Sequence, residues 1–102
     1  MNNRLILHDE LIEVSGLQKV YFQPPESVKL TYPCIIYHKA AKINRYADDR
    51  RYAGYDRYDI TIISRDPDND LADKLLDHFR YCAFARRYTA DNLYHDALEL
   101  YY

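Results

Sequence analysis

Arg-Tyr-Asp-Ile-Thr-Ile-Ile-Ser, residues 57–64, is the stretch of sequence that decides the fold class. Its apolar residues Tyr58, Ile60 and Ile62 stand at every second position, with polar residues between them. This alternation predicts a strand that buries one face and exposes the other. Residues 34–39, Cys-Ile-Ile-Tyr-His-Lys, predict a second strand that follows Pro33, and we expect the two strands to pair as an antiparallel hairpin.

Two amphipathic segments flank these strands. In residues 4–15, Leu7, Leu11 and Val14 recur at three- and four-residue spacing, which predicts a helix with one apolar face. Gly16 is suited to the C-terminal end of that helix. Residues 70–79 predict a second helix, and the acidic run at residues 66–70 offers N-cap side chains for it. The apolar stripe of the second helix comprises Leu71, Leu75, Leu76 and Phe79.

Three further stretches complete the predicted fold. Residues 20–22 are a short extended piece, and residues 81–88 and 93–101 predict a second hairpin with Ala90-Asp91-Asn92 as its turn. The order α-β-β-β-α-β-β predicts a single α+β domain over residues 1–102, with an antiparallel sheet of about four to five strands and two helices packed on it. Its expected core comprises Leu7, Leu11, Ile35, Ile60, Ile62, Leu71, Leu75, Phe79, Phe84 and Leu98.

The composition argues against several classes of partner. The chain has 102 residues, a formal net charge of −2 and a pI near 6.0, which disfavours a whole-domain electrostatic grip on nucleic acid or anionic lipid. No apolar run approaches the roughly 20 residues of a membrane span, so we expect no membrane partner. Cys34 and Cys82 have apolar neighbours and are expected to be reduced core thiols. The twelve tyrosines suit half-exposed sheet faces and protein–protein contacts.

Residues 40–56, between the two central strands, form the segment that fits this fold least well. The segment is long for a hairpin connection, and Ile43 is its only large aliphatic residue. With the flanking Lys39 and Arg57, six basic residues stand against three acidic ones, so residues 39–57 carry +3 and the rest of the chain carries −5. Three interpretations remain open: a solvated hairpin tip, a protein-binding arm, or a platform for single-stranded nucleic acid. The candidate interface residues of the protruding arm are Arg45, Tyr46, Arg50, Arg51, Tyr52 and Tyr55.

The sequence contains no pattern typical of an active site or a metal centre. The four histidines fall on four different predicted elements, and neither cysteine has the close partner that a zinc site needs. The Asp66–Asp70 run superficially resembles a calcium loop, but Leu71 stands where such a loop requires glycine. The serines lack a nucleophile motif. We therefore expect no enzymatic activity, no catalytic residues, no metal and no cofactor.

Three stretches, in this order and spacing, resemble the small neck proteins of long-tailed bacteriophages, the tail terminator or tail completion proteins. The resemblance covers residues 4–102, nearly the whole chain. The first stretch is Val20–Pro25 with Tyr32–Tyr37, the second is Tyr58–Ile63 with Asp66–Asp68 and Lys74–Leu76, and the third is Asp91–Asp96 running to Leu100–Tyr102.

The resemblance implies a structural virion protein of the tail–neck region, made in the cytoplasm of a host bacterium. Proteins of this family are α+β subunits that form a hexameric ring on the end of the tail tube. The ring ends tube polymerisation and joins the tail to the head connector. The implied partners are other copies of the chain, the tail tube protein and a head connector or head-closure protein, with DNA passing through the lumen without specific binding. The alternatives are another neck component, such as a head-closure or minor capsid protein, and a small protein- or nucleic-acid-binding adaptor.

Overall fold

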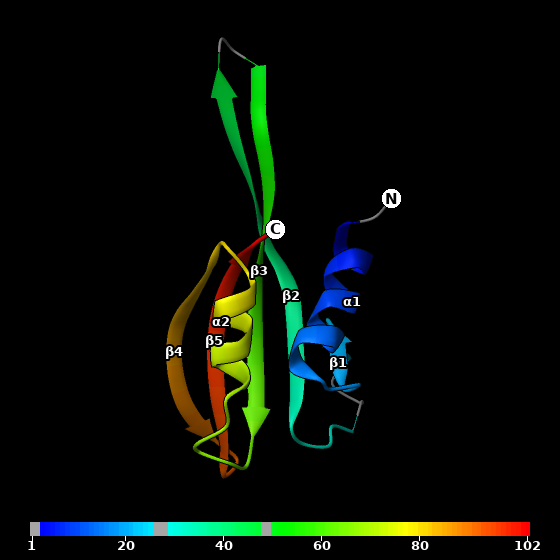
Figure 1. The fold of residues 1–102 in the computed structure, drawn as a ribbon, viewed down its shortest axis with the longest axis vertical. Coiled ribbons are helices and arrows are strands. Elements are labelled where there is room, and N and C mark those ends of the chain that lie inside the picture. The colour runs from blue at the N-terminus through cyan, green and yellow to red at the C-terminus, as the bar shows by residue number, and fades with distance from the viewer. Residues whose placement is uncertain (1–2, 26–28, 48–49) are drawn as a thin grey trace.

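The computed structural model describes the backbone of residues 3–25, 29–47 and 50–102, and the side chains of residues 4–25, 29–40 and 56–102. The predicted order α-β-β-β-α-β-β is confirmed, and the fold is α+β (Figure 1). The elements are α1 (Asn3–Ser15), β1 (Val20–Phe22), β2 (Cys34–Ala47), β3 (Arg50–Ser64), α2 (Leu71–His78), β4 (Cys82–Ala90) and β5 (Leu93–Tyr101).

The five strands form one sheet in the order β1-β2-β3-β5-β4. Strands β2 to β5 pair antiparallel, as predicted, but β1 lies parallel to β2, with Val20 opposite Ile35. The expectation of a wholly antiparallel sheet was therefore wrong at this edge. The connection from β1 to β2 spans residues 23–33, which is long enough to return the chain to the end of the sheet where β1 began.

Local sequence signals explain how the elements end. Gly16 adopts φ +74° and its N–H donates to the carbonyl of Ile12 at 2.9 Å, which ends α1 as predicted. Asp91 and Asn92, with φ of 52° and 61°, supply the two positive φ angles of a tight hairpin turn, so the predicted turn between β4 and β5 is confirmed. In the acidic run before α2, Asp70 makes no side-chain cap hydrogen bond, and Asn69 Oδ1 accepts the N–H of Leu71, the first residue of the helix, at 3.3 Å instead.

The core lies between the two helices and one face of the sheet, where α1 and α2 contribute Leu7, Leu11 and Leu75, all 0% exposed. Phe84 was predicted to belong to this core and is 47% exposed, because β4 is the edge strand and the helices do not cover it. Tyr37 and Tyr58 are 0% and 1% exposed and complete the core, although the composition favoured half-exposed positions for tyrosine. The other predicted core residues are buried: Ile35, Ile60, Ile62, Leu71, Phe79 and Leu98.

A smaller apolar cluster lies on the opposite face of the sheet. Cys34, Ile63 and Leu93 are buried there, and Leu30 and Tyr32 from the β1–β2 connection pack against them. Both cysteines are free thiols, as expected. Burial raises the pKa of both thiols, that of Cys82 to about 11.

Candidate functional site

The outer half of the β2–β3 hairpin is the predicted functional segment, and it projects beyond the rest of the fold (Figure 1). Antiparallel pairing of β2 with β3 continues from Cys34 opposite Ile63 to Ala47 opposite Arg50. The sheet neighbours stop much earlier, since β1 reaches only Tyr37 and the backbone pairing of the C-terminal strand with β3 ends at Asp56. Within the described backbone, the outer hairpin is thus a two-stranded ribbon with both edges open. This projection gives the molecule principal extents of 50 × 26 × 24 Å.

An ion pair joins the two strands at the base of the hairpin, where the hairpin leaves the body. Lys39 Nζ lies 3.3 Å from Asp56 Oδ2, across the two strands. Lys39 also lies over the ring of Tyr58, 5.9 Å from its centroid. The pairing register shifts between Lys39 and Ala41, which is the position of a β-bulge. A bulge increases the local twist of a strand pair, so this irregularity marks the point where the ribbon leaves the sheet.

Beneath the hairpin base lies a column of aromatic side chains. Tyr37 packs against Phe22 and Tyr58, with ring centroids 5.0 Å and 6.1 Å apart. Its hydroxyl is 2.6 Å from His8 Nδ1 on α1. Burial raises the pKa of both tyrosines, and nearby Arg4 partly lowers that of Tyr37. The column anchors the inner half of the hairpin to α1.

The six predicted interface residues lie on the outer hairpin. Their backbone belongs to β2 and β3, where Tyr46 stands opposite Arg51, Ala47 opposite Arg50 and Ile43 opposite Tyr55. A second register shift, between Arg45 and Tyr46, lies close to the hairpin end. The side chains of Arg45, Tyr46, Arg50, Arg51, Tyr52 and Tyr55 lie outside the described residues. The pairing nevertheless brings all six positions to one end of the molecule, as the sequence required of a protruding arm.

Strand β4, predicted as a strand over residues 81–88, is a second exposed segment, and its exposure was not predicted. None of its nine residues is buried, because β4 is the outer strand of the sheet and the helices leave it uncovered. A bulge between Phe84 and Arg86 interrupts its pairing, and Arg86 lies over the Tyr88 ring at 4.8 Å. Bulges and charged side chains are devices that discourage pairing at a sheet edge. This strand therefore has the features of a protected edge.

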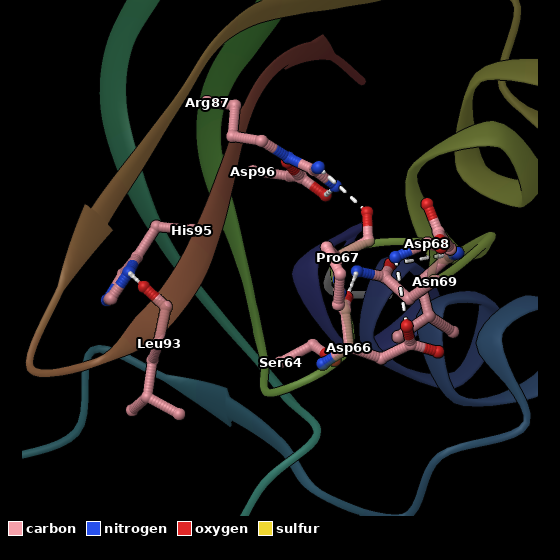
Figure 2. Close-up of polar contacts among 10 residues, drawn as sticks. Ser64, Asp66, Pro67, Asp68, Asn69, Arg87, Leu93, His95 and Asp96 are labelled. Atoms are coloured by element: carbon pink, nitrogen blue, oxygen red, sulfur yellow. Dashed lines mark hydrogen bonds and ion pairs between the residues drawn. The ribbon is translucent and has the colours of Figure 1, made fainter.

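Arg87 connects β4 to the body (Figure 2). Its Nε and Nη2 donate to the two carboxylate oxygens of Asp96 at 2.6 Å and 3.2 Å, and its Nη1 donates to the carbonyl of Pro67 at 2.8 Å. Asp96 is 2% exposed, so this ion pair neutralises a buried charge. The hydrogen bond to Asp96 raises the pKa of the Arg87 guanidinium. The signal available in the sequence was an acidic residue at an otherwise apolar core position of β5.

The β3–α2 connection, which lies at the end of the molecule opposite the hairpin (Figure 1), lines an acidic cleft of about 440 Å³. Three carboxylates of the β3–α2 connection contribute to its wall. The connection is ordered by Asp66, whose Oδ1 accepts the N–H of Asp68 at 2.9 Å and whose carbonyl accepts Asn69 Nδ2 at 3.0 Å (Figure 2). The acidic lining residues are Asp66, Asp68 and Asp70, the basic one is Arg65, and the apolar ones are Leu17, Tyr32, Pro33 and Leu71.

Neither the described residues nor the comparisons with known proteins assign a chemical activity to the chain. No group of three or more His, Cys, Asp or Glu side chains that could hold a metal ion occurs in the described part of the chain. Over the same residues, no helix has the length and apolar character needed to cross a membrane. No protein-family model matches the chain, and no curated protein matches it.

Proposed function

We propose that this chain is a structural subunit of the bacteriophage neck, a tail terminator that assembles as a ring on the tail tube and joins it to the head connector. The observation that carries the proposal is the outer β2–β3 hairpin, which extends past every neighbouring strand. A two-stranded hairpin is at best marginally stable in water. An element of this kind is therefore best explained by contact with another subunit or with the tube.

The composition of the hairpin supports contact with protein. Residues 39–57 carry +3 in an acidic chain and include three tyrosines among the arginines at positions 45, 50, 51 and 57. Tyr and Arg are enriched at the energetic centres of protein interfaces, because their planar groups give a large contact at a limited cost in conformational entropy. The resemblance described above is the reason for proposing the tail terminator family. A ring subunit needs extensive contacts of this kind. The proposal includes no catalytic step.

The test is an assembly experiment with the tube protein encoded in the same genome. Purified wild-type chain should form rings, bind tube ends and limit tube length, as seen by negative-stain electron microscopy. The variant Arg50→Ser/Arg51→Ser/Tyr52→Ser should fold but leave overlong or unjoined tubes. The control Arg86→Ser/Tyr88→Ser removes a similar Arg/Tyr pair from the protected edge strand β4 and should assemble normally.

Two results would contradict the proposal. A triple variant that folds and still limits tube length as the wild type does would reduce the hairpin to a solvated tip. A wild-type chain that ignores tube ends but binds short DNA, with strong weakening by salt, would favour the nucleic-acid adaptor.

A further inference from the structure

The formal charges of the chain are segregated between the hairpin and the helical side of the molecule. Residues 39–57 carry +3. Residues 3–15, which form α1, carry −2, and residues 65–78, which contain α2 and the connection before it, carry −3. The remaining residues sum to zero. The whole acidic excess therefore lies on the helices and the β3–α2 connection, and the whole basic excess lies on the hairpin.

The acidic cleft is a hollow in this acidic region. The side chains of Asp66, Asp68 and Asp70 are exposed at its wall, while Leu17 and Leu71 contribute apolar surface. Asp70 is 70% exposed and has Lys74 at 3.7 Å as an (i, i+4) neighbour. A pair this exposed contributes little and is easily exchanged for a better one. Three carboxylates against one guanidinium, that of Arg65, make the lining net acidic. The cleft is therefore suited to a ligand with guanidinium groups and aromatic rings.

We infer that the acidic cleft receives the outer β2–β3 hairpin of a neighbouring copy of this chain. The inference rests on the proposed function, since it names the surface on which one ring subunit holds the next. Arg50 and Arg51 would meet the carboxylates, for which the guanidinium fork is the best matched cation. The hairpin tyrosines would cover the apolar part of the cleft with their rings.

The proposed contact joins two different surfaces, a hairpin on one subunit and a cleft on the next, so it has a direction. The hairpin and the cleft lie at opposite ends of β3, because β3 runs from Arg50 at the hairpin to Ser64 just before the cleft (Figure 1). A contact between two different surfaces is heterologous, so each subunit donates one hairpin and accepts another. Such contacts generate a closed ring when the rotation between subunits closes.

Complementary variants test the direction of the contact. Arg50→Asp/Arg51→Asp disables the hairpin, and Asp68→Lys/Asp70→Lys disables the cleft while keeping the Asp66 turn. Either variant alone should be monomeric by sedimentation velocity, with self-association weakened about tenfold or more by like-charge contact. An equimolar mixture should assemble again, because the intact hairpin meets the intact cleft and the reversed hairpin meets the reversed cleft. A chain carrying all four substitutions should assemble again.

The control is Asp73→Lys/Asp77→Lys, which makes the same change of charge at two exposed positions of α2 outside the cleft. It should assemble as the wild type does. If the cleft variant unfolds, as judged by circular dichroism, Asp68→Asn/Asp70→Asn removes the charge without reversing it and should also weaken assembly.

The outcomes separate this inference from the proposed function. A wild-type chain that is monomeric at every concentration, a folded cleft variant that assembles normally, or a mixture that does not assemble overturns the hairpin–cleft contact. Tube-length control could still be correct in each of those cases. Conversely, assembly of the mixture with no effect of the wild type on tubes would support the contact and contradict the proposed function.

Discussion

The tripeptide Arg-Arg-Tyr occurs twice in this chain, at residues 50–52 of β3 and at residues 86–88 of β4, and the two copies have different surroundings. In β4 two of the three residues contact the neighbouring strand β5. Arg87 pairs with buried Asp96, Arg86 lies over the Tyr88 ring, and that ring stacks on His95 with centroids 4.7 Å apart. In β3 the backbone of residues 50–52 pairs only with β2, beyond the end of β5. The β4 copy contacts the neighbouring strand of the sheet, whereas the backbone of the β3 copy lies beyond the end of β5.

Neither residue type nor local pattern decides the role of these arginines. The sheet order decides it, because β5 places Asp96 opposite Arg87 and supplies no residue opposite the outer hairpin. An arginine beside a buried carboxylate is committed to that contact. An arginine on an open ribbon is available to a partner. Substitutions in the two regions should therefore divide cleanly between stability and assembly.

The largest effect on stability is expected in the body, at Leu75. This residue is 0% exposed in the cluster between α2 and the sheet. Leu75→Ala should lower the free energy of unfolding by about 2–5 kcal/mol, from lost burial and the cavity left behind. Urea denaturation measures the loss, and Leu5→Ala, at a position 52% exposed, is the control expected to change little. A Leu75 variant as stable as the wild type would mean that the body does not depend on this cluster.

The body was predictable because it follows short-range rules. Leucine spacing predicted both helices, alternation from Tyr58 to Ile62 predicted the buried face of β3, and Asp91-Asn92 predicted a turn that needs positive φ. Phe84 was misplaced because a strand's exposure depends on its position in the sheet, which periodicity does not contain. The parallel pairing of β1 was missed for the same reason, since the sequence gives no rule for which edge a three-residue strand joins.

The second largest effect on stability is expected at Arg87, in the β4 copy of the tripeptide. Arg87→Ala leaves the Asp96 carboxylate, 2% exposed, without its guanidinium partner. The loss should be about 2–3 kcal/mol, below that of a fully buried pair because the Arg87 side chain is 39% exposed. Arg86→Ala should change the free energy of unfolding by less than about 0.5 kcal/mol. Equal effects of the two substitutions would contradict the distinction between them.

A smaller effect is expected from pH, at the place where the body meets the hairpin. Tyr102 pairs with Asp56 through its backbone and donates its hydroxyl to Glu10 Oε1 at 2.9 Å. Burial, then the contact with Glu10, raises the pKa of Tyr102 from its usual 10 to about 12. The folded chain therefore holds this proton between about pH 10 and 12, where the unfolded chain has lost it, so the stabilisation is complete below pH 10 and is lost as pH rises through 12.

Tyr102→Phe isolates this contribution from those of the other buried tyrosines and cysteines. The variant should lose stability less steeply than the wild type between pH 10 and 12. Tyr88→Phe, at an exposed position of β4, is the control and should keep the wild-type slope. Denaturation curves across this range supply the comparison. Parallel curves for Tyr102→Phe and the wild type would show that the hydroxyl does not link α1 to the C-terminal strand.

The candidate site was predictable only in part. Length, charge and the shortage of aliphatic residues singled out residues 40–56 because they are properties of a continuous segment. Two features were not predictable in this way. The acidic cleft combines Leu17, Tyr32 and Pro33 with the β3–α2 connection, which are far apart in the sequence and meet only in the fold. The two arginine-rich tripeptides differ only through strand order, which is a long-range property.

The smallest effect on stability is expected for the hairpin copy of the tripeptide. Arg50→Ser/Arg51→Ser/Tyr52→Ser changes residues whose backbone pairs beyond the last residue of β5 and whose segment has no aliphatic core of its own. The melting temperature should therefore stay within about 1–2 °C of the wild type, the shift expected for a few tenths of a kcal/mol in a domain of this size. Differential scanning calorimetry measures it, with Arg87→Ala in the same series as the variant that should fall clearly. A comparable fall for the hairpin triple would place residues 50–52 in the cooperative unit of the body, and the contrast between the two tripeptides would then be wrong.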